Sequence, residues 1–288
     1  MKNVIAALLV WAACAGIASA KTYDSIPFPQ GQESRIVPDA SLPDKKSLPQ
    51  QSAPIPGTSF VVIQSRGGSL LLGPLMGSAN IKAKTKELAD QSKGSGYVGT
   101  DIGAIATQSL TRIGVAAGTA DGAYVLRPFS FAQQCEDGKM RFAVVYDVTG
   151  PGPKNPWRGR YSYHLPTPIP AEQFNAPSPE QVQQFVAEVT AGADALTSLI
   201  ERDMKGALPA TGKKVKFGSL DLQGNKMGGL GIYTMPETMA YENVQLIEEK
   251  DGYVIVRING NPNATALFGG LLFGVHRMRR DAVHTLTE

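Results

Sequence analysis

Residues 179–205 constrain the fold more than any other segment, because they have the pattern of one long amphipathic helix. Ser178 is placed to cap the first turn, Pro179 suits the first helical position, and Gln181 completes a capping box. Gly206 then provides a helix end. Apolar residues recur along a single stripe at helical spacing: Val182, Phe185, Val186, Val189, Ala193, Leu196 and Ile200. Such a stripe has to be buried against a sheet or against other helices.

Most of the other patterned sequence predicts strands, because runs of β-branched and aromatic residues alternate with Gly and Pro turn residues. Two shorter helices are expected over 79–92 and 101–116. We therefore predict an α+β fold: a largely antiparallel sheet on which the 179–205 helix and one or two shorter helices pack. The expected strands are 60–63, 69–72, 123–131, 139–148, 159–165, 215–222, 243–248, 253–258 and 275–279, with 286 as the furthest end of the last.

The first twenty residues have the pattern of a bacterial secretory signal peptide. Lys2 gives a positive start, residues 4–10 form an apolar run, and cleavage is expected between Ala20 and Lys21, after small residues. The apolar run is shorter than the roughly 20 residues that cross a bilayer. We expect a mature chain without a transmembrane span, in the periplasm or outside the cell.

A lipid anchor on Cys14 is the alternative to soluble export, but the bulky Trp11 three residues earlier argues against it. Cleavage after Ala20 removes Cys14 and leaves Cys135 alone, so the mature chain has no internal disulfide. We interpret Cys135 as a half-buried thiol at a strand end, since a lone Cys usually behaves as a small hydrophobe.

Seven of the twenty prolines fall within residues 21–57. Proline lacks an amide donor and holds its neighbour extended, so this stretch predicts a semi-rigid, poorly ordered arm. The globular part is expected as a single domain over 58–288, with a boundary near 206–212 as the alternative.

The sequence argues against nucleic-acid binding and against dinucleotide binding. Loss of Lys2 leaves 27 Lys and Arg against 25 Asp and Glu, a balance of +2 that gives no steering field for nucleic acid. The glycines of residues 94–99 have the spacing of a dinucleotide-binding loop. The residues before them, however, predict a helix and not the strand that such a loop requires. We interpret residues 94–99 as a helix–helix connection and expect no cofactor.

Catalytic and metal motifs are equally weak. The three histidines, His164, His276 and His284, are too scattered to form a local zinc motif, and no nucleophile elbow is found. We therefore expect no metal, and the sequence assigns no catalytic residue.

The most distinctive polar stretch is 157–164. Alternation in a strand places Tyr163 on one face and Arg158, Arg160 and His164 on the other, with Trp157 at the start. Arginines with an imidazole could receive a carboxylate, a phosphate or a sulfated sugar, whereas tyrosines could stack on sugar or peptide. These five residues are the candidate ligand-binding set. The alternative places the tyrosines in the core and the arginines in solvent.

These features favour a non-enzymatic, exported cell-envelope protein that binds a partner protein, or a polysaccharide or other anionic polymer of the envelope. The alternative is an exported hydrolase that uses Asp147, His164 or another constellation assembled only by the fold. The sequence identifies neither the ligand nor an oligomeric state.

Overall fold

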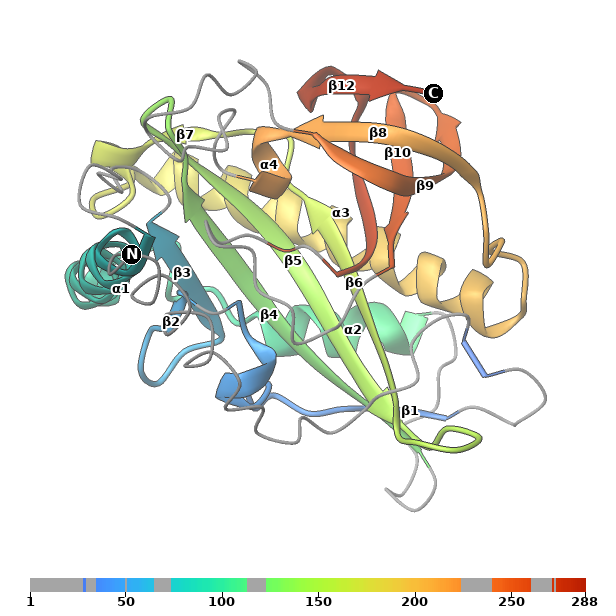
Figure 1. The fold of residues 1–288 in the computed structure, drawn as a ribbon. Coiled ribbons are helices and arrows are strands. Elements are labelled where there is room, and N and C mark those ends of the chain that lie inside the picture. The colour runs from blue at the N-terminus through green and yellow to red at the C-terminus, as the bar shows by residue number, and fades with distance from the viewer. Residues whose placement is uncertain are drawn as a thin grey trace, which may run out of the picture.

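The computed structural model describes residues 28–29, 35–49, 51–64, 74–112, 123–223, 240–259, 271 and 273–288. The signal peptide, its cleavage site at Ala20 and Lys21, Cys14 and the expected strand 69–72 lie outside these residues. Figure 1 shows the described chain as long central strands with helices behind them and a second group of strands at one end.

The described strands form one sheet in the order β12-β8-β9-β10-β11-β6-β5-β4-β3-β2, with β1 beside β4 and β7 beside β5. Most neighbouring pairs are antiparallel, and β1·β4, β3·β4 and β6·β11 are parallel. This architecture confirms the α+β prediction. The strands are β1 (Ile36–Pro38), β2 (Ala53–Pro54), β3 (Phe60–Gln64), β4 (Tyr124–Gln134), β5 (Lys139–Gly150), β6 (Trp157–His164), β7 (Ile169–Pro170), β8 (Lys213–Ser219), β9 (Tyr241–Lys250), β10 (Tyr253–Ile258), β11 (Gly274–Arg279) and β12 (Val283–Thr287).

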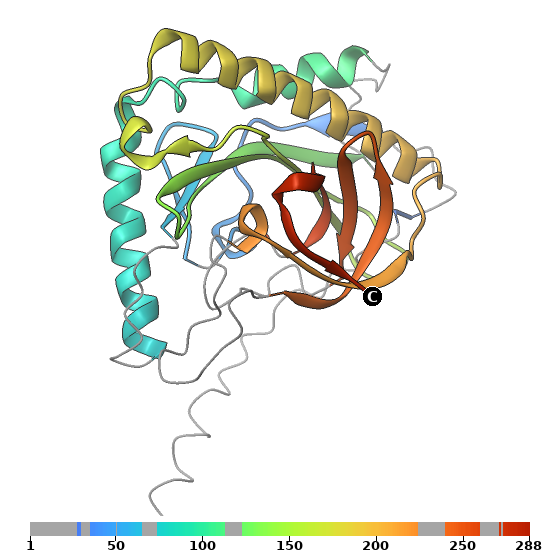
Figure 2. The same cartoon turned by 90° about the horizontal axis from the view of Figure 1, so that it is seen from above.

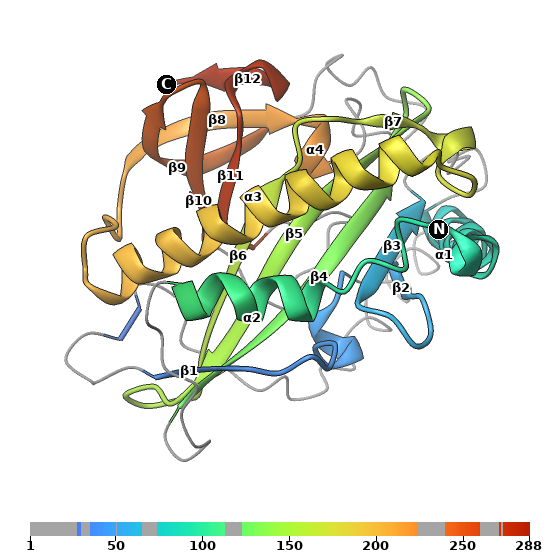
Figure 3. The same cartoon turned by 180° about the vertical axis from the view of Figure 1, so that it is seen from behind.

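One face of the sheet is covered by α2 (Ile102–Arg112) and the long α3 (Pro179–Met204), which cross the strands side by side in Figure 3. The predicted capping box is present, because Ser178 and Gln181 bond each other's backbone amides. The apolar stripe of α3 joins Tyr146, Trp157 and Tyr161 of the sheet in one core. The remaining helices are α1 (Pro74–Gln91), the four-residue α4 (Leu220–Gln223) and single 3-10 turns at Lys45–Ser47, Ser92–Gly94, Ala171–Gln173 and Arg280–Ala282.

The described part of 21–57 belongs to the domain, which corrects the expectation of an arm outside it. Ile36 is fully buried, and its strand β1 pairs with the start of β4. Leu48 packs with Val61 and Phe129 on the face of the sheet away from α3. The prolines make this stretch extended, as predicted, but its apolar residues are spaced so that they insert into the core.

The C-terminal strands β8 to β12 curl away from the long strands and enclose a smaller core of their own (Figure 2). They stay joined to the rest of the sheet, because β11 runs parallel to β6 with Val275 opposite Tyr161. Strands from before and after 206–212, the alternative domain boundary, therefore belong to one continuous sheet.

The glycine-containing segment 94–99 follows α1 and leads into α2 through a turn. A helix and not a strand precedes these glycines, which confirms the prediction of a helix–helix connection.

Candidate ligand pocket

Strand β6 is buried along its whole length, so the exposed contact face considered for it does not exist. The alternation is as predicted: Trp157 and Tyr163 lie in the core under α3, and Arg158, Arg160 and His164 face the other way. Trp157 folds back over Gly159, where an added Cβ would lie 2.3 Å from the indole.

The face with the arginines is covered by the segment that the sequence placed outside the domain. The Ser47 carbonyl accepts hydrogen bonds from Nη2 of Arg158 at 3.2 Å and Nη2 of Arg160 at 2.6 Å. Leu48 packs beside it against the sheet. The alternative, with arginines in solvent, is therefore wrong as well.

Both guanidinium groups converge on one carboxylate, Asp147, which lies opposite Arg160 on β5. Arg158 Nη2 donates to Asp147 Oδ1 and Oδ2 at 2.9 and 3.0 Å, and Arg160 Nη2 donates to Oδ1 at 3.1 Å. Each of the three side chains is at most 3% exposed. Because Asp147 and both guanidinium groups are paired inside the protein and at most 3% of each side chain is exposed, this cluster contributes mainly to folding.

Two histidines that the sequence treated as scattered lie together next to this cluster. His164 Nε2 lies 3.2 Å from His276 Nδ1, on neighbouring parallel strands. Burial lowers the pKa of His164 to about 4 and holds the pKa of His276 well below its ordinary value, with His164 and Arg160 adding to the second effect. Both rings are therefore neutral at pH 7. Asp147 and His164, named for the hydrolase alternative, are thus part of the interior.

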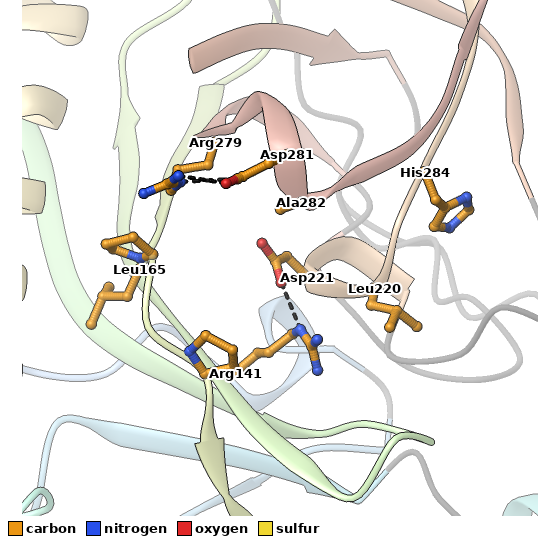
Figure 4. A pocket seen from close by; sticks show the side chains of 10 residues that line it. Arg141, Leu165, Leu220, Asp221, Arg279, Asp281, Ala282 and His284 are labelled. Carbon is orange, nitrogen blue, oxygen red and sulfur yellow. Dashed lines mark hydrogen bonds and ion pairs between the residues drawn. The ribbon is translucent and has the colours of Figure 1, made fainter. Parts of the chain in front are cut away.

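A cavity with five ionisable side chains lies between the β11–β12 connection, α4 and the segment after β6 (Figure 4). We call it the Asp221 pocket. Its volume is about 300 Å³. Its lining combines two arginines, two aspartates and a histidine with apolar and proline residues: Arg141, Leu165, Pro166, Pro168, Leu220, Asp221, Arg279, Asp281, Ala282 and His284.

Two ion pairs line the pocket. Arg141 Nε lies 2.8 Å from Asp221 Oδ1, and its Nη1 lies 2.9 Å from Asp137 Oδ1. Arg279 pairs with Asp281 at the more exposed part of the wall, where about half of each side chain or more is open to solvent. Figure 4 shows these two pairs on either side of the cavity. The pocket therefore presents both signs of charge to a ligand.

Asp221 is a largely buried carboxyl of the pocket whose pKa its surroundings raise. Burial raises the pKa of this carboxyl to about 6, although Arg141 pulls it down, and the carboxylates of Asp137 and Asp281 raise it further. Asp221 therefore changes charge between pH 5 and 7, and it can accept or donate a proton there.

Cys135 lies behind this pocket, with its Sγ 3.7 Å from the Leu220 carbonyl. Its side chain is fully buried, which replaces the expected half-buried position. Burial raises the pKa of the thiol to about 12, although Arg141 pulls it down, and Asp221 and Asp137 raise it by smaller amounts. A neutral, enclosed thiol is a poor nucleophile.

Sequence reasoning missed the pocket, because its lining comes from four separate parts of the chain. Arg279 and Asp281 stand out only as part of a charged C-terminal run. Arg141 follows Asp137 across the β4–β5 hairpin, which predicts their pairing, but no local pattern brings Asp221 to them.

The chain matches no protein-family model, and no curated protein and no solved structure is significantly similar to it. Among the described residues, no group of three His, Cys, Asp or Glu side chains is arranged to hold a metal ion. None of the described helices has an apolar stretch that is long enough to cross a membrane.

Proposed function

We propose that this is an exported, non-enzymatic protein of the bacterial cell envelope that binds a partner protein or an envelope polymer at the Asp221 pocket. The export part rests on the sequence pattern of residues 1–20. Intact-mass measurement on the native protein tests it: soluble export predicts a chain that begins at Lys21. A chain with Met1 retained would contradict export, and a lipid mass on Cys14 would establish the anchored alternative.

The observation that carries the binding proposal is the composition of the pocket. Arg279 and Asp281 offer half-exposed charges at the wall, and Leu165 and Pro168 offer apolar surface beside them. Such a mixture suits a ligand that carries charged groups on an apolar or polymeric frame. The candidate nucleophile nearest to it, Cys135, is buried and neutral.

Replacing Arg279 with alanine should weaken saturable binding of the purified mature protein to isolated envelope fractions about tenfold, as expected for loss of a charged contact with the ligand. Co-sedimentation at several protein concentrations measures the change. Arg112→Ala is the matched control, because Arg112 is a similarly exposed arginine that is paired with an aspartate on the α2–α3 side. Equal binding by wild type and Arg279→Ala would contradict the proposed site.

One observation favours the hydrolase alternative. Asp221 has a pKa of about 6 and faces a second carboxylate, Asp281, across the same pocket. A carboxyl with a raised pKa beside an ionised one is an arrangement used for general acid–base chemistry. Release of soluble fragments from envelope polymers by wild type, with loss in Asp221→Asn, would establish this alternative. The binding proposal predicts no release by either protein.

A further inference from the structure

The carboxyl group of Asp221 has one oxygen bound to the protein and one open to its pocket. Oδ1 lies 2.8 Å from Arg141 Nε. Among the described residues, Oδ2 has no hydrogen-bond partner, and Figure 4 shows it turned away from Arg141 toward Ala282 and the cavity. The side chain is 11% exposed, so a group that enters the cavity can reach this oxygen. Asp221 can therefore accept hydrogen bonds from a ligand.

Arg141 does not balance the charge of Asp221 fully, because its guanidinium group contacts two carboxylates. Nη1 and Nη2 donate to the two oxygens of Asp137, each at 2.9 Å, and Nε is left for Asp221. Asp281 across the cavity is paired with Arg279. Together with Asp137, the aspartates and arginines of the lining comprise three carboxylates and two guanidinium groups. A cation at the open oxygen would balance the excess negative charge.

The protonation of Asp221 agrees with this charge balance. Burial raises the pKa of the carboxyl to about 6, Arg141 lowers it, and Asp137 and Asp281 raise it further. A raised pKa means that the ionised form lacks compensating positive charge in the folded protein. A cation bound at Oδ2 would supply that charge and lower the pKa.

The site favours an ammonium group over a guanidinium group. A guanidinium binds best to both oxygens of a carboxylate, whereas Asp221 has one oxygen open. An ammonium is a compact cation with three rotatable donors, so a single oxygen can hold it. Leu165, Pro168 and Leu220 provide apolar wall in the cavity of about 300 Å³, which suits the alkyl stem of a long-chain amine.

We propose that the Asp221 pocket binds a primary ammonium group at the end of an alkyl chain, as in a lysine side chain, with the ammonium donating to Asp221 Oδ2. This deepens the proposed function, on which it rests, by favouring a protein partner over an amino-sugar polymer. In an amino sugar the ammonium is attached directly to the ring, so no alkyl stem is present to contact Leu165 and Leu220. Arg279, half-exposed at the wall, would contact an acidic group of the same partner.

NMR titration of the isotope-labelled mature protein at pH 7 tests the proposal. The probes are N-acetyl-lysine methylamide, its norleucine and arginine analogues, and methyl glucosaminide. The lysine probe should cause saturable shifts at residues 165–168, 220–222 and 279–284. It should bind about tenfold more tightly than the norleucine probe, which lacks the ammonium, the value of one charge-assisted hydrogen bond. It should also bind more tightly than the other two probes.

Asp221→Asn should bring the lysine and norleucine probes within about twofold of each other. Asp194→Asn is the matched control and should keep the preference, because Asp194 pairs with Arg112 on the α2–α3 side. The Asp221→Asn protein should not melt at a lower temperature at pH 7, because a carboxyl with a raised pKa opposes folding where it is ionised. Loss of the preference then reports on the pocket.

The affinity for the lysine probe should fall about tenfold from pH 7 to pH 5, because Asp221, with its pKa of about 6, takes up a proton and loses its charge. The norleucine probe should show no such change. His284→Gln should keep the tenfold change, which separates Asp221 from the histidine of the same lining.

The other charged groups around Asp221 keep their charge in this pH range. The hydrogen bond from Arg279 lowers the pKa of Asp281. Burial raises the pKa of Asp137, but the hydrogen bonds and charge of Arg141 outweigh it and the pKa is lowered. His164, whose ring bonds the backbone of Asp221, has a pKa of about 4 because it is buried, and it stays neutral.

Four results would overturn the proposal: equal binding of the lysine and norleucine probes, tighter binding of the arginine probe or of the glucosaminide, a preference that survives Asp221→Asn, or an affinity for the lysine probe that does not change between pH 7 and pH 5. None of them involves Arg279→Ala or envelope fractions. Failure here is therefore distinguishable from failure of envelope binding at the same pocket.

Discussion

Replacing Asp147 with asparagine should lower the free energy of unfolding by about 3–5 kcal/mol, the largest effect expected for a single substitution in this protein. Asp147 is the carboxylate that both Arg158 and Arg160 contact, and all three side chains are buried. The neutral amide leaves two buried guanidinium charges without a counter-ion. Urea denaturation at pH 7, followed by circular dichroism, measures the change.

Asp194→Asn provides the matched control, because Asp194 pairs with Arg112 at a position where about half of each side chain is exposed. Its loss should cost less than about 1 kcal/mol. A combined Asp147→Leu, Arg158→Met, Arg160→Met variant should be more stable than Asp147→Asn, since it removes the charges together. If the free energy of unfolding of Asp147→Asn lies within about 1 kcal/mol of the wild-type value, the cluster is not the buried ionic centre described above.

Acidification should destabilise the protein through the His164–His276 pair. The pKa of His164 is about 4 in the folded protein, against an ordinary value of 6.5. As the pH falls below 6.5, the unfolded chain binds the proton first, so the contribution to stability is complete above pH 6.5 and is lost toward pH 4. A shift of this size corresponds to about 3 kcal/mol for His164, and His276 acts in the same direction.

Asp221 opposes this trend, because its pKa is raised to about 6 and the folded protein therefore binds its proton first on acidification. The histidine contribution is isolated by comparing variants. His164→Gln and His276→Gln together should remove most of the loss in unfolding free energy between pH 6.5 and 4.5. Replacing the third histidine, His284, with glutamine should leave that loss in unfolding free energy unchanged. An unchanged pH dependence in the double variant would show that the pair is not buried and neutral.

The sequence predicts the local structure of this protein well. The start of α3 was predicted correctly, because the capping box is a local interaction between Ser178 and Gln181. The alternation of β6 also holds, because side chains in a strand must alternate. Neither rule says whether a face is covered. The group that covers Arg160 is the Ser47 carbonyl, 113 residues away in a proline-containing segment whose composition resembles a tether.

The candidate site could not be predicted for a related reason. Histidines 112 residues apart meet because β11 pairs with β6 in parallel, a topology that no local pattern specifies. Asp221 reaches Arg141 because a four-residue helix follows β8 beside the β4–β5 hairpin. Long-range strand order therefore decided which residues became interior and which line a pocket.

Modification of arginines by phenylglyoxal, read by peptide mass spectrometry, tests most directly whether contacts are made at the Asp221 pocket and not on β6. In the free native protein, Arg279 and Arg112 should react readily, whereas Arg158 and Arg160 should stay unmodified until the chain unfolds. On the envelope fraction, Arg279 should become protected and Arg112 should not. Reaction of Arg158 and Arg160 as fast as that of Arg279, or protection of Arg112 alone, would contradict this account.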